Sequence, residues 1–189
     1  MLQIDTSYLR TDTPQVGFAP YRQIHLHSTA NARSTAASEA SYMSRKNLSE
    51  GYYTHVVGNG KIYQTAHVGR GAYDVGGDWN YETYAAVELI ESHTTYDEFL
   101  RDYKLYIELL RQLGTESGIA FTLDTPETEG FKTHNYATAT GHGSDHVDPL
   151  PYLGKWGISF GQLKNDLLNG FEEIQESRQP GILLGQKRG

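Results

Sequence analysis

The segment Arg22-Gln23-Ile24-His25-Leu26-His27 decides the fold, because its side chains alternate between polar and apolar. An alternation of period two is typical of a β-strand, in which successive side chains point to opposite sides of a sheet. His25 and His27 would then share one polar face, while Ile24 and Leu26 lie on the buried face. We therefore expect a strand over residues 22–27 that presents two histidines to the same side.

The residues after this strand predict a helix, a hairpin and another strand. Residues 34–47 are rich in alanine and serine, which favours a helix. Residues 53–57 and 61–65 predict a β-hairpin, because Gly58-Asn59-Gly60 between them supplies residues that tolerate positive φ. The apolar stretch 84–90, interrupted by one acidic residue, predicts a further strand.

The second half of the chain predicts two helices and a long loop. Apolar residues recur at helical spacing over 97–113, and Gly114 is expected to end that helix. Residues 119–123 predict a strand, and the threonine, glycine and histidine content of 125–143 predicts a long functional loop. A final helix is expected to begin at Ser159.

Strand and helix patterns alternate along the chain without a low-complexity break, which predicts a single α/β domain. We place that domain at residues 1–173. Residues 174–189 contain Pro180-Gly181 and a basic end, and we interpret them as a linker-like tail.

The composition excludes several classes of protein. A net charge of -7 argues against a nucleic-acid partner, which would require a clustered basic surface. There is no cysteine, so a metal site cannot use thiolate and a cysteine nucleophile is excluded. The N-terminus has no apolar core typical of a secretory signal, and no apolar run is long enough to cross a bilayer. We therefore expect no membrane insertion.

The distribution of the eight histidines suggests a metal site. His25 and His27 share a strand face, and the predicted loop with its flank holds three more histidines beside two aspartates: His134, His142, His146, Asp145 and Asp148. A catalytic zinc site needs three protein ligands and an open position, which imidazole and carboxylate groups can supply. Spacing alone leaves open the alternative of hydrogen-bonded or surface histidines.

The stretch Ile24-His25-Leu26-His27-Ser28-Thr29-Ala30-Asn31 resembles the opening motif of the N-acetylmuramoyl-L-alanine amidase type 2 family, which shares its fold with peptidoglycan recognition proteins. In that family a strand ends in a zinc-binding histidine followed by a Thr-Ala-Asn-like turn. The resemblance implies a central mixed β-sheet flanked by helices. It also implies a zinc ligand at His27, with His25 as a neighbour.

Two later motifs extend the resemblance. Tyr84-Ala85-Ala86-Val87-Glu88-Leu89 resembles the family strand that carries the catalytic glutamate, which implies Glu88 as general base; the alternative is an outward-facing glutamate in an edge strand. The segments Thr133-His134-Asn135-Tyr136 and Asp145 to Leu153 resemble the phage-lysin branch, which implies His134 and Asp148 as the other two ligands. Many relatives place a lysine two residues before the last ligand, where this chain has His146, and an imidazole could also stabilise an oxyanion.

The same resemblance implies a set of substrate-binding residues. The loop Gly71 to Gly76 and the pair Trp79-Asn80 match the family loop before the glutamate strand, where aromatic and polar side chains line the substrate groove. Covering the core is an equally good interpretation of the aromatic residues. The expected substrate-binding residues are Tyr53, Tyr73, Asp74, Trp79, Asn80 and His142, and the roles of His25, His55 and His142 stay open.

The resemblance implies a zinc-dependent amidase that hydrolyses the lactyl-L-Ala amide of bacterial peptidoglycan. A peptidoglycan-recognition module without activity and a zinc peptidase that cuts within the stem peptide are the alternatives. The lysin-like motif and the tail suggest the catalytic domain of a phage endolysin. Such an enzyme waits in the host cytoplasm until a holin opens the membrane, and a C-terminal cell-wall-binding domain would normally follow it.

Overall fold

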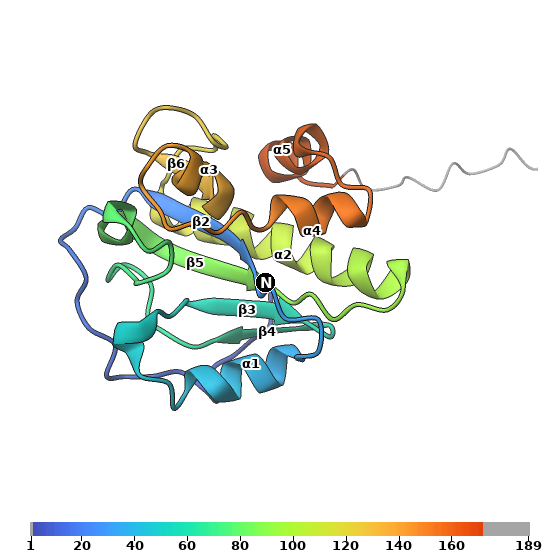
Figure 1. Cartoon of the computed structure of the whole chain (residues 1–189), viewed down its shortest axis with the longest axis horizontal. Helices are drawn as coiled ribbons and strands as arrows, with labels where there is room; N and C mark the ends of the chain where they lie inside the picture. Colours follow the sequence, from blue (N-terminus) through green and yellow to red (C-terminus); the bar gives the residue numbers. More distant parts are fainter. Residues whose placement is uncertain (1, 172–189) are drawn as a thin grey trace, which may run out of the picture.

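A computed structural model describes residues 2–171 of the chain, and these form one mixed six-stranded sheet with helices on both faces (Figure 1). The strand order is β1-β4-β3-β5-β2-β6, with β3 and β4 antiparallel and the other neighbours parallel. The expected fold class is therefore confirmed. The strands are β1 (Ile4–Asp5), β2 (Gln23–Ser28), β3 (His55–Gly58), β4 (Lys61–Gln64), β5 (Thr83–Leu89) and β6 (Gly130–Thr133).

Five α-helices and two short 3-10 helices connect and cover these strands. The α-helices are α1 (Ala36–Met43), α2 (Tyr96–Ser117), α3 (His134–Ala139), α4 (Leu150–Lys155) and α5 (Phe160–Asn169). The 3-10 helices are η1 (Leu48–Glu50) and η2 (Asp78–Tyr81). Among residues 2–171, no helix combines the length and the apolar character needed to cross a membrane.

The long helix α2 covers one face of the sheet and makes the main core (Figure 1). Its sequence specifies both ends: Thr95 and Glu98 form a capping box at the start, and Gly118 takes the left-handed conformation at the end. The apolar residues of β2 and β5 face it, including Ile24, Leu26 and Val87, all of them fully buried. The side chains on this face of the sheet form the main hydrophobic core.

On the opposite face of the sheet, one half is covered by a helix and the other half carries polar side chains. Helix α1 contacts β3 and β4 there. The other half carries the polar side chains of β2 and β5, including His25, His27 and Glu88. All six residues of β2 are buried, so the polar face expected from the alternation is covered by neighbouring segments and not by water. The division leaves a set of polar groups in one protected place.

The hairpin and the strand over 84–90 are confirmed, as β3, β4 and β5. Asn59 and Gly60 form the hairpin turn with φ of 53° and 72°, as the Asn-Gly pair predicts. Helix α1 falls within the expected range 34–47, and α5 begins directly after Ser159, whose side chain caps it.

Three predictions in the second half of the chain are wrong. Helix α2 continues past Gly114, where a Cβ atom would lie 2.6 Å from the Phe131 ring; the glycine permits close packing of the helix and does not end it. Residues 119–123 form no strand and contribute only an isolated bridge between Leu123 and Phe131. The expected loop 125–143 contains β6 and α3. The predicted tail 174–189 lies outside the described residues.

Candidate metal centre

Three neighbouring parallel strands end where the polar groups meet. His27 is the penultimate residue of β2, Glu88 is the penultimate residue of β5, and His134 directly follows β6. In the parallel pairing of β2 with β5, His27 lies opposite Glu88. The carboxyl ends of parallel strands commonly carry the binding site of an α/β protein, because loops there converge on one edge. The register thus brings together residues far apart in the sequence.

His27, His134 and Asp148 form a compact group that could hold a metal ion. One ligand atom from each lies within 4.8 Å of the others. His27 Nδ1 is 3.1 Å from Asp148 Oδ2, and His134 Nδ1 is 3.2 Å from Asp148 Oδ1. Two imidazoles and one carboxylate are a ligand set suited to zinc with an open position. The structure therefore brings together the three residues expected as ligands.

A second group of possible ligands consists of His25, His27 and Asp74. This group is closed by its own hydrogen bonds: Asp74 Oδ2 lies 2.6 Å from His25 Nδ1 and 3.0 Å from His27 Nε2. His25 is fully buried, and its other nitrogen is 2.8 Å from Gln23 Oε1. His25 is fully buried and the Asp74 side chain is 2% exposed, whereas the Asp148 side chain is 12% exposed, so the group with Asp148 is more accessible to a ligand. The group with His134 and Asp148 is the better metal centre.

The electrostatics of the centre also suit a cation. Glu88, Asp74 and Asp148 surround His27 and contribute three carboxyl groups. Burial is the main cause that raises the pKa of Glu88 to about 8, and its Oε2 atom is buried without a hydrogen-bond partner. An unpartnered buried carboxyl oxygen costs free energy unless a ligand, water or ion reaches it. The Oε2 atom of Glu88 is therefore available to a ligand, water or ion that binds at the centre.

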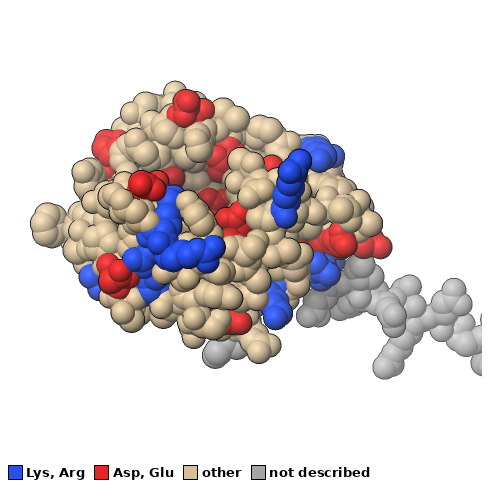
Figure 2. Space-filling model, turned by 60° about the horizontal axis from the view of Figure 1, so that its bottom comes forward, with Lys and Arg blue, Asp and Glu red and all other residues tan. Residues whose placement is uncertain are grey.

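A cavity of about 260 Å³ opens over the centre. His27, His134, Asp148 and Glu88 lie at one part of its wall. Figure 2 shows a hollowed face of the molecule on which acidic side chains lie deep and basic side chains lie around them. Further lining side chains come from the end of β2 and the turn after it, from α1 and η1 with their flanking residues, and from the loop after β4. They include Glu39, Tyr42, Met43, Lys46, Glu50, Tyr52, Tyr53 and Tyr73.

Tyr53 and Tyr73, which were expected at the substrate, and His146, which was expected at the oxyanion, lie at this cavity. His146 lines it and keeps a side chain that is 65% exposed, with its Nδ1 3.9 Å from Asp148 Oδ1. Tyr73 also lines it and is partly exposed. Tyr53 lines it from a buried position beside Glu39, and burial raises the pKa of its hydroxyl well above the usual value. All three could contact a ligand bound at the metal centre.

Trp79, Asn80 and His142 make contacts with their own part of the protein. Trp79 is only 7% exposed, and His142 stacks on its ring at a centroid distance of 4.4 Å. His142 Nδ1 is also 2.9 Å from Asp78. Asn80 Oδ1 accepts three backbone N–H groups of its own loop. These contacts help to hold the loop together, and the substrate contacts expected of the three side chains stay a prediction.

The side chains of His55 and Asp74 are buried and have hydrogen-bond partners within the protein. His55 is buried in β3 beside Thr54, and burial lowers its pKa to about 3, which keeps it neutral. Asp74 borders the cavity but its side chain is only 2% exposed and is bonded to His25 and His27. Its direct contact with a substrate is therefore not supported by the geometry.

Sequence reasoning missed several residues that shape the site. Ser144 Oγ lies 3.0 Å from His134 Nε2, and Thr83 donates to Asp74 Oδ1 at 2.8 Å. Lys46 and Glu39 line the cavity from α1 and its C-terminal extension. Nothing in the local sequence distinguishes these residues from ordinary surface or strand positions. Only the folded arrangement identifies them.

Comparisons with known proteins identify relatives by sequence. The lytic amidase of Streptococcus pneumoniae phage HB-3 is 56% identical over 171 residues, which cover 89% of this chain and 54% of the relative. The endolysin of Listeria phage A511 is 38% identical over 145 residues, which cover 75% of this chain and 42% of the relative. The chain thus spans about half the length of the curated relatives it matches. No family model matches the sequence.

Solved structures give the same picture for the fold. The crystal structure of the Staphylococcus aureus hydrolase AmiA in complex with its ligand aligns with a TM-score of 0.78 and 27% identity. The alignment covers 89% of this chain and 82% of that one. The solution structure of the PlyG catalytic domain aligns with a TM-score of 0.68 at 20% identity, which supports the fold alone.

Proposed function

From the premise that this chain belongs to the same family as the phage lytic amidase and endolysin, we propose that it is a zinc-dependent N-acetylmuramoyl-L-alanine amidase. It would hydrolyse the amide between the lactyl group of peptidoglycan and the first stem residue, L-alanine. The observation that carries the proposal is the convergence of His27, His134 and Asp148 beside Glu88. The names of the relatives support amide hydrolysis as the reaction, and the cluster contains side chains that could carry it out.

The donor set supports zinc as the metal. His27 and His134 offer ring nitrogens and Asp148 offers carboxylate oxygens, while the outer nitrogens of both rings are already hydrogen-bonded. The buried and unpartnered Oε2 atom of Glu88 adds a further reason to expect a ligand at this place. When bound, a zinc ion would act as a Lewis acid that polarises the scissile carbonyl and acidifies water.

The residues around the centre divide the proton chemistry between them. Glu88 would accept a proton from the attacking water and return it to the departing amine. Its raised pKa suits the second step, and a cation beside it would favour the carboxylate form needed for the first. His146, exposed at the rim and close to Asp148, would donate a hydrogen bond to the oxyanion that forms at the carbonyl. Tyr53 and Tyr73 would contact the substrate along the cavity.

The cellular setting is part of the proposal. The relatives carry sequence beyond the part that matches this chain, which supports a phage endolysin with a cell-wall-binding domain elsewhere in the protein. Bacterial peptidoglycan would be the partner. The enzyme would wait in the host cytoplasm until a holin opens the membrane, and then act on the cell wall.

The test is mass spectrometry of digested peptidoglycan, together with elemental analysis of the purified protein. We expect near-stoichiometric zinc and new L-alanine amino termini, and both should disappear after chelation and return with added zinc. Bound zinc with intact peptidoglycan would instead indicate a recognition module. Cleavage between residues of the stem peptide would indicate a peptidase.

A further inference from the structure

The loop that follows Tyr73 contacts both histidines of the metal centre on their outer sides. His27 presents Nδ1 to Asp148 and Nε2 to Asp74 Oδ2, at 3.0 Å. An ionised carboxylate can only accept hydrogen bonds, so the Nε2 atom of His27 must carry a hydrogen. The lone pair available to a metal is then on Nδ1. Asp74 therefore selects which nitrogen of His27 faces the centre.

The next residue of the loop does the same for the other histidine. His134 Nε2 lies 3.1 Å from the carbonyl oxygen of Val75 and 3.0 Å from Ser144 Oγ. A carbonyl oxygen is an acceptor only, so the Nε2 atom of His134 also carries a hydrogen. The adjacent residues Asp74 and Val75 thus orient two ligands, one in β2 and one at the start of α3.

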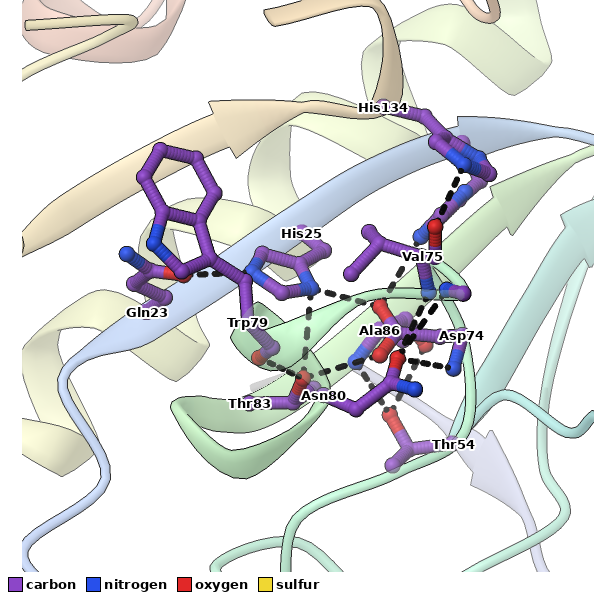
Figure 3. Close-up of polar contacts among 12 residues, drawn as sticks. Gln23, His25, Thr54, Asp74, Val75, Trp79, Asn80, Thr83, Ala86 and His134 are labelled. Atoms are coloured by element: carbon purple, nitrogen blue, oxygen red, sulfur yellow. Dashed lines mark hydrogen bonds and ion pairs between the residues drawn. The ribbon is translucent and has the colours of Figure 1, made fainter. Parts of the chain in front are cut away.

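A network of polar side chains holds these two residues in place (Figure 3). Asn80 Oδ1 accepts the backbone N–H groups of Asp74 and Val75 at 3.0 Å each, and that of Gly76 at 3.2 Å. The Asp74 carboxylate is held in turn by Thr83 Oγ1 at 2.8 Å and by His25 Nδ1 at 2.6 Å. Because both carboxylate oxygens of Asp74 have protein partners, the direction of the side chain is fixed before any ligand arrives.

We infer that Asp74 is a positioning residue, which with the Val75 carbonyl presets His27 and His134 to bind a metal through Nδ1, and that Asn80 maintains the loop geometry on which this depends. The inference rests on the proposed metal function of the centre. It assigns Asp74 and Asn80 to the ligands and not to the substrate, and it gives His25 the role of a buried anchor for Asp74. Outer partners of this kind commonly change metal affinity by about 10- to 100-fold when they are removed.

The first experiment reads the coordinating atoms directly in the unmodified chain. The protein is labelled with ¹⁵N in its histidines and loaded with ¹¹³Cd, and scalar coupling between the metal and ring nitrogens is measured by NMR. We expect coupling to Nδ1 of both His27 and His134. Coupling to Nε2 of either ring, or to a nitrogen of His25, would overturn the inference. This readout needs no turnover, so a failure of the proposed amidase activity is distinguishable from a failure here.

The second experiment measures zinc affinity by competition with a chromophoric chelator. Asp74→Asn should weaken zinc binding by about 10- to 100-fold. Asn80→Ala should weaken it less, since the carboxylate itself remains. The matched control is Asp78→Asn in the same segment, because the Asp78 side chain is 66% exposed and its ion pair within residues 2–171 is with His142. The zinc affinity of this variant should match that of the unmodified protein. Unchanged zinc affinity in folded Asp74→Asn would overturn the inference.

A third variant keeps the test decisive if Asp74→Asn fails to fold. Thr83→Val has nearly the same shape and removes only the hydroxyl that donates to Asp74 Oδ1. We expect weaker zinc binding in this variant, together with a lower unfolding temperature of its zinc-free form, because buried Asp74 Oδ1 loses its donor. A lower unfolding temperature with unchanged zinc affinity would indicate a purely structural role of the network and would count against positioning.

Discussion

Two buried groups in this molecule contain the same residue types, histidine and aspartate, but have different roles. The metal cluster consists of His27, His134 and Asp148. The hairpin cluster consists of His93 and Asp102, with Arg101 beside them. Asp102 is fully buried, and its oxygens accept from the backbone N–H groups of the hairpin turn, from His93 Nε2 and from Arg101 Nε. It fastens helix α2 to the turn between β3 and β4.

The difference between the two clusters lies in their surroundings, because the metal cluster lines a cavity and has a buried carboxyl oxygen without a partner beside it. In the hairpin cluster, His93 uses its second nitrogen on the Tyr152 hydroxyl, so both ring nitrogens and both Asp102 oxygens have protein partners. In the metal cluster, two Nδ1 atoms converge on one carboxylate, and a buried oxygen of neighbouring Glu88 has no partner. A satisfied cluster stabilises the fold, whereas an unsatisfied one at a cavity predicts a ligand.

The largest expected effect is at Glu88. Glu88→Ala should lower the rate of amide hydrolysis by about 10²- to 10⁴-fold, because it removes the group that moves the proton. Bound zinc should stay near the unmodified level. The measurement is release of L-alanine amino termini, with Glu116→Gln on the exposed side of α2 as control. Activity within about threefold of the unmodified protein would remove Glu88 from the mechanism.

The hairpin cluster should respond in stability and not in activity. Asp102→Ala leaves His93 and the N–H groups of Asn59 and Gly60 without their acceptor. Breaking a buried charged group of this kind typically costs about 3–5 kcal/mol of unfolding free energy. Urea unfolding measures the loss, and zinc affinity of the folded fraction should not change. A loss below about 1 kcal/mol would show that the cluster does not fasten the hairpin.

The pH dependence of stability tests the same cluster more finely. Burial acts to raise the pKa of Asp102, but hydrogen bonds from His93, Arg101 and the Gly60 N–H outweigh it and lower the pKa from 3.8 to about 2. Ionised Asp102 therefore contributes stability that is fully present above about pH 4 and is lost as the pH falls from 3.8 toward 2. We expect the stability gap between the unmodified protein and Asp102→Asn to shrink by about 2 kcal/mol over that range. A gap that does not change with pH would contradict the assignment.

The smallest effect concerns the aromatic lining of the cavity. Tyr73→Ala should raise KM by about 2- to 10-fold, since one partly exposed ring contributes on the order of 1 kcal/mol to binding. His142→Ala should leave KM in place, because His142 stacks on Trp79 and pairs with Asp78. Steady-state kinetics on soluble peptidoglycan fragments distinguishes the two. An equal rise in KM for both variants would indicate that His142 contacts the substrate.

The sequence was most informative where a polar or charged residue stood within a periodic strand pattern. Alternation in β2 correctly placed His25 and His27 on one face, and the acidic residue within an apolar strand drew attention to Glu88, which lies opposite His27. Periodicity reports on which side a side chain lies, and that information is local. The positions of Asp74, Trp79 and Asn80 in a loop carried no such information, because a polar loop residue has the same sequence signature whether it contacts a ligand or its own backbone.

The missed elements share a different cause. Strand β6 has four residues, too few for a visible period, and it contains Lys132, which is buried because its ammonium donates to the carbonyls of Thr125 and Glu127. Gly114 predicted the end of α2, yet its role is close packing on Phe131. In both places tertiary contacts overrode local preference, and such contacts cannot be read from neighbouring residues.

The two faces of the sheet give a protein engineer two separate tasks. Stability depends on the packing between α2 and the sheet, where residues such as Ile107 or Leu110 tolerate exchanges of similar volume best. Specificity can be altered at the cavity through α1 and η1, whose side chains line it without holding the metal ligands. Because the strands separate these regions, changes made in one should combine additively with changes made in the other.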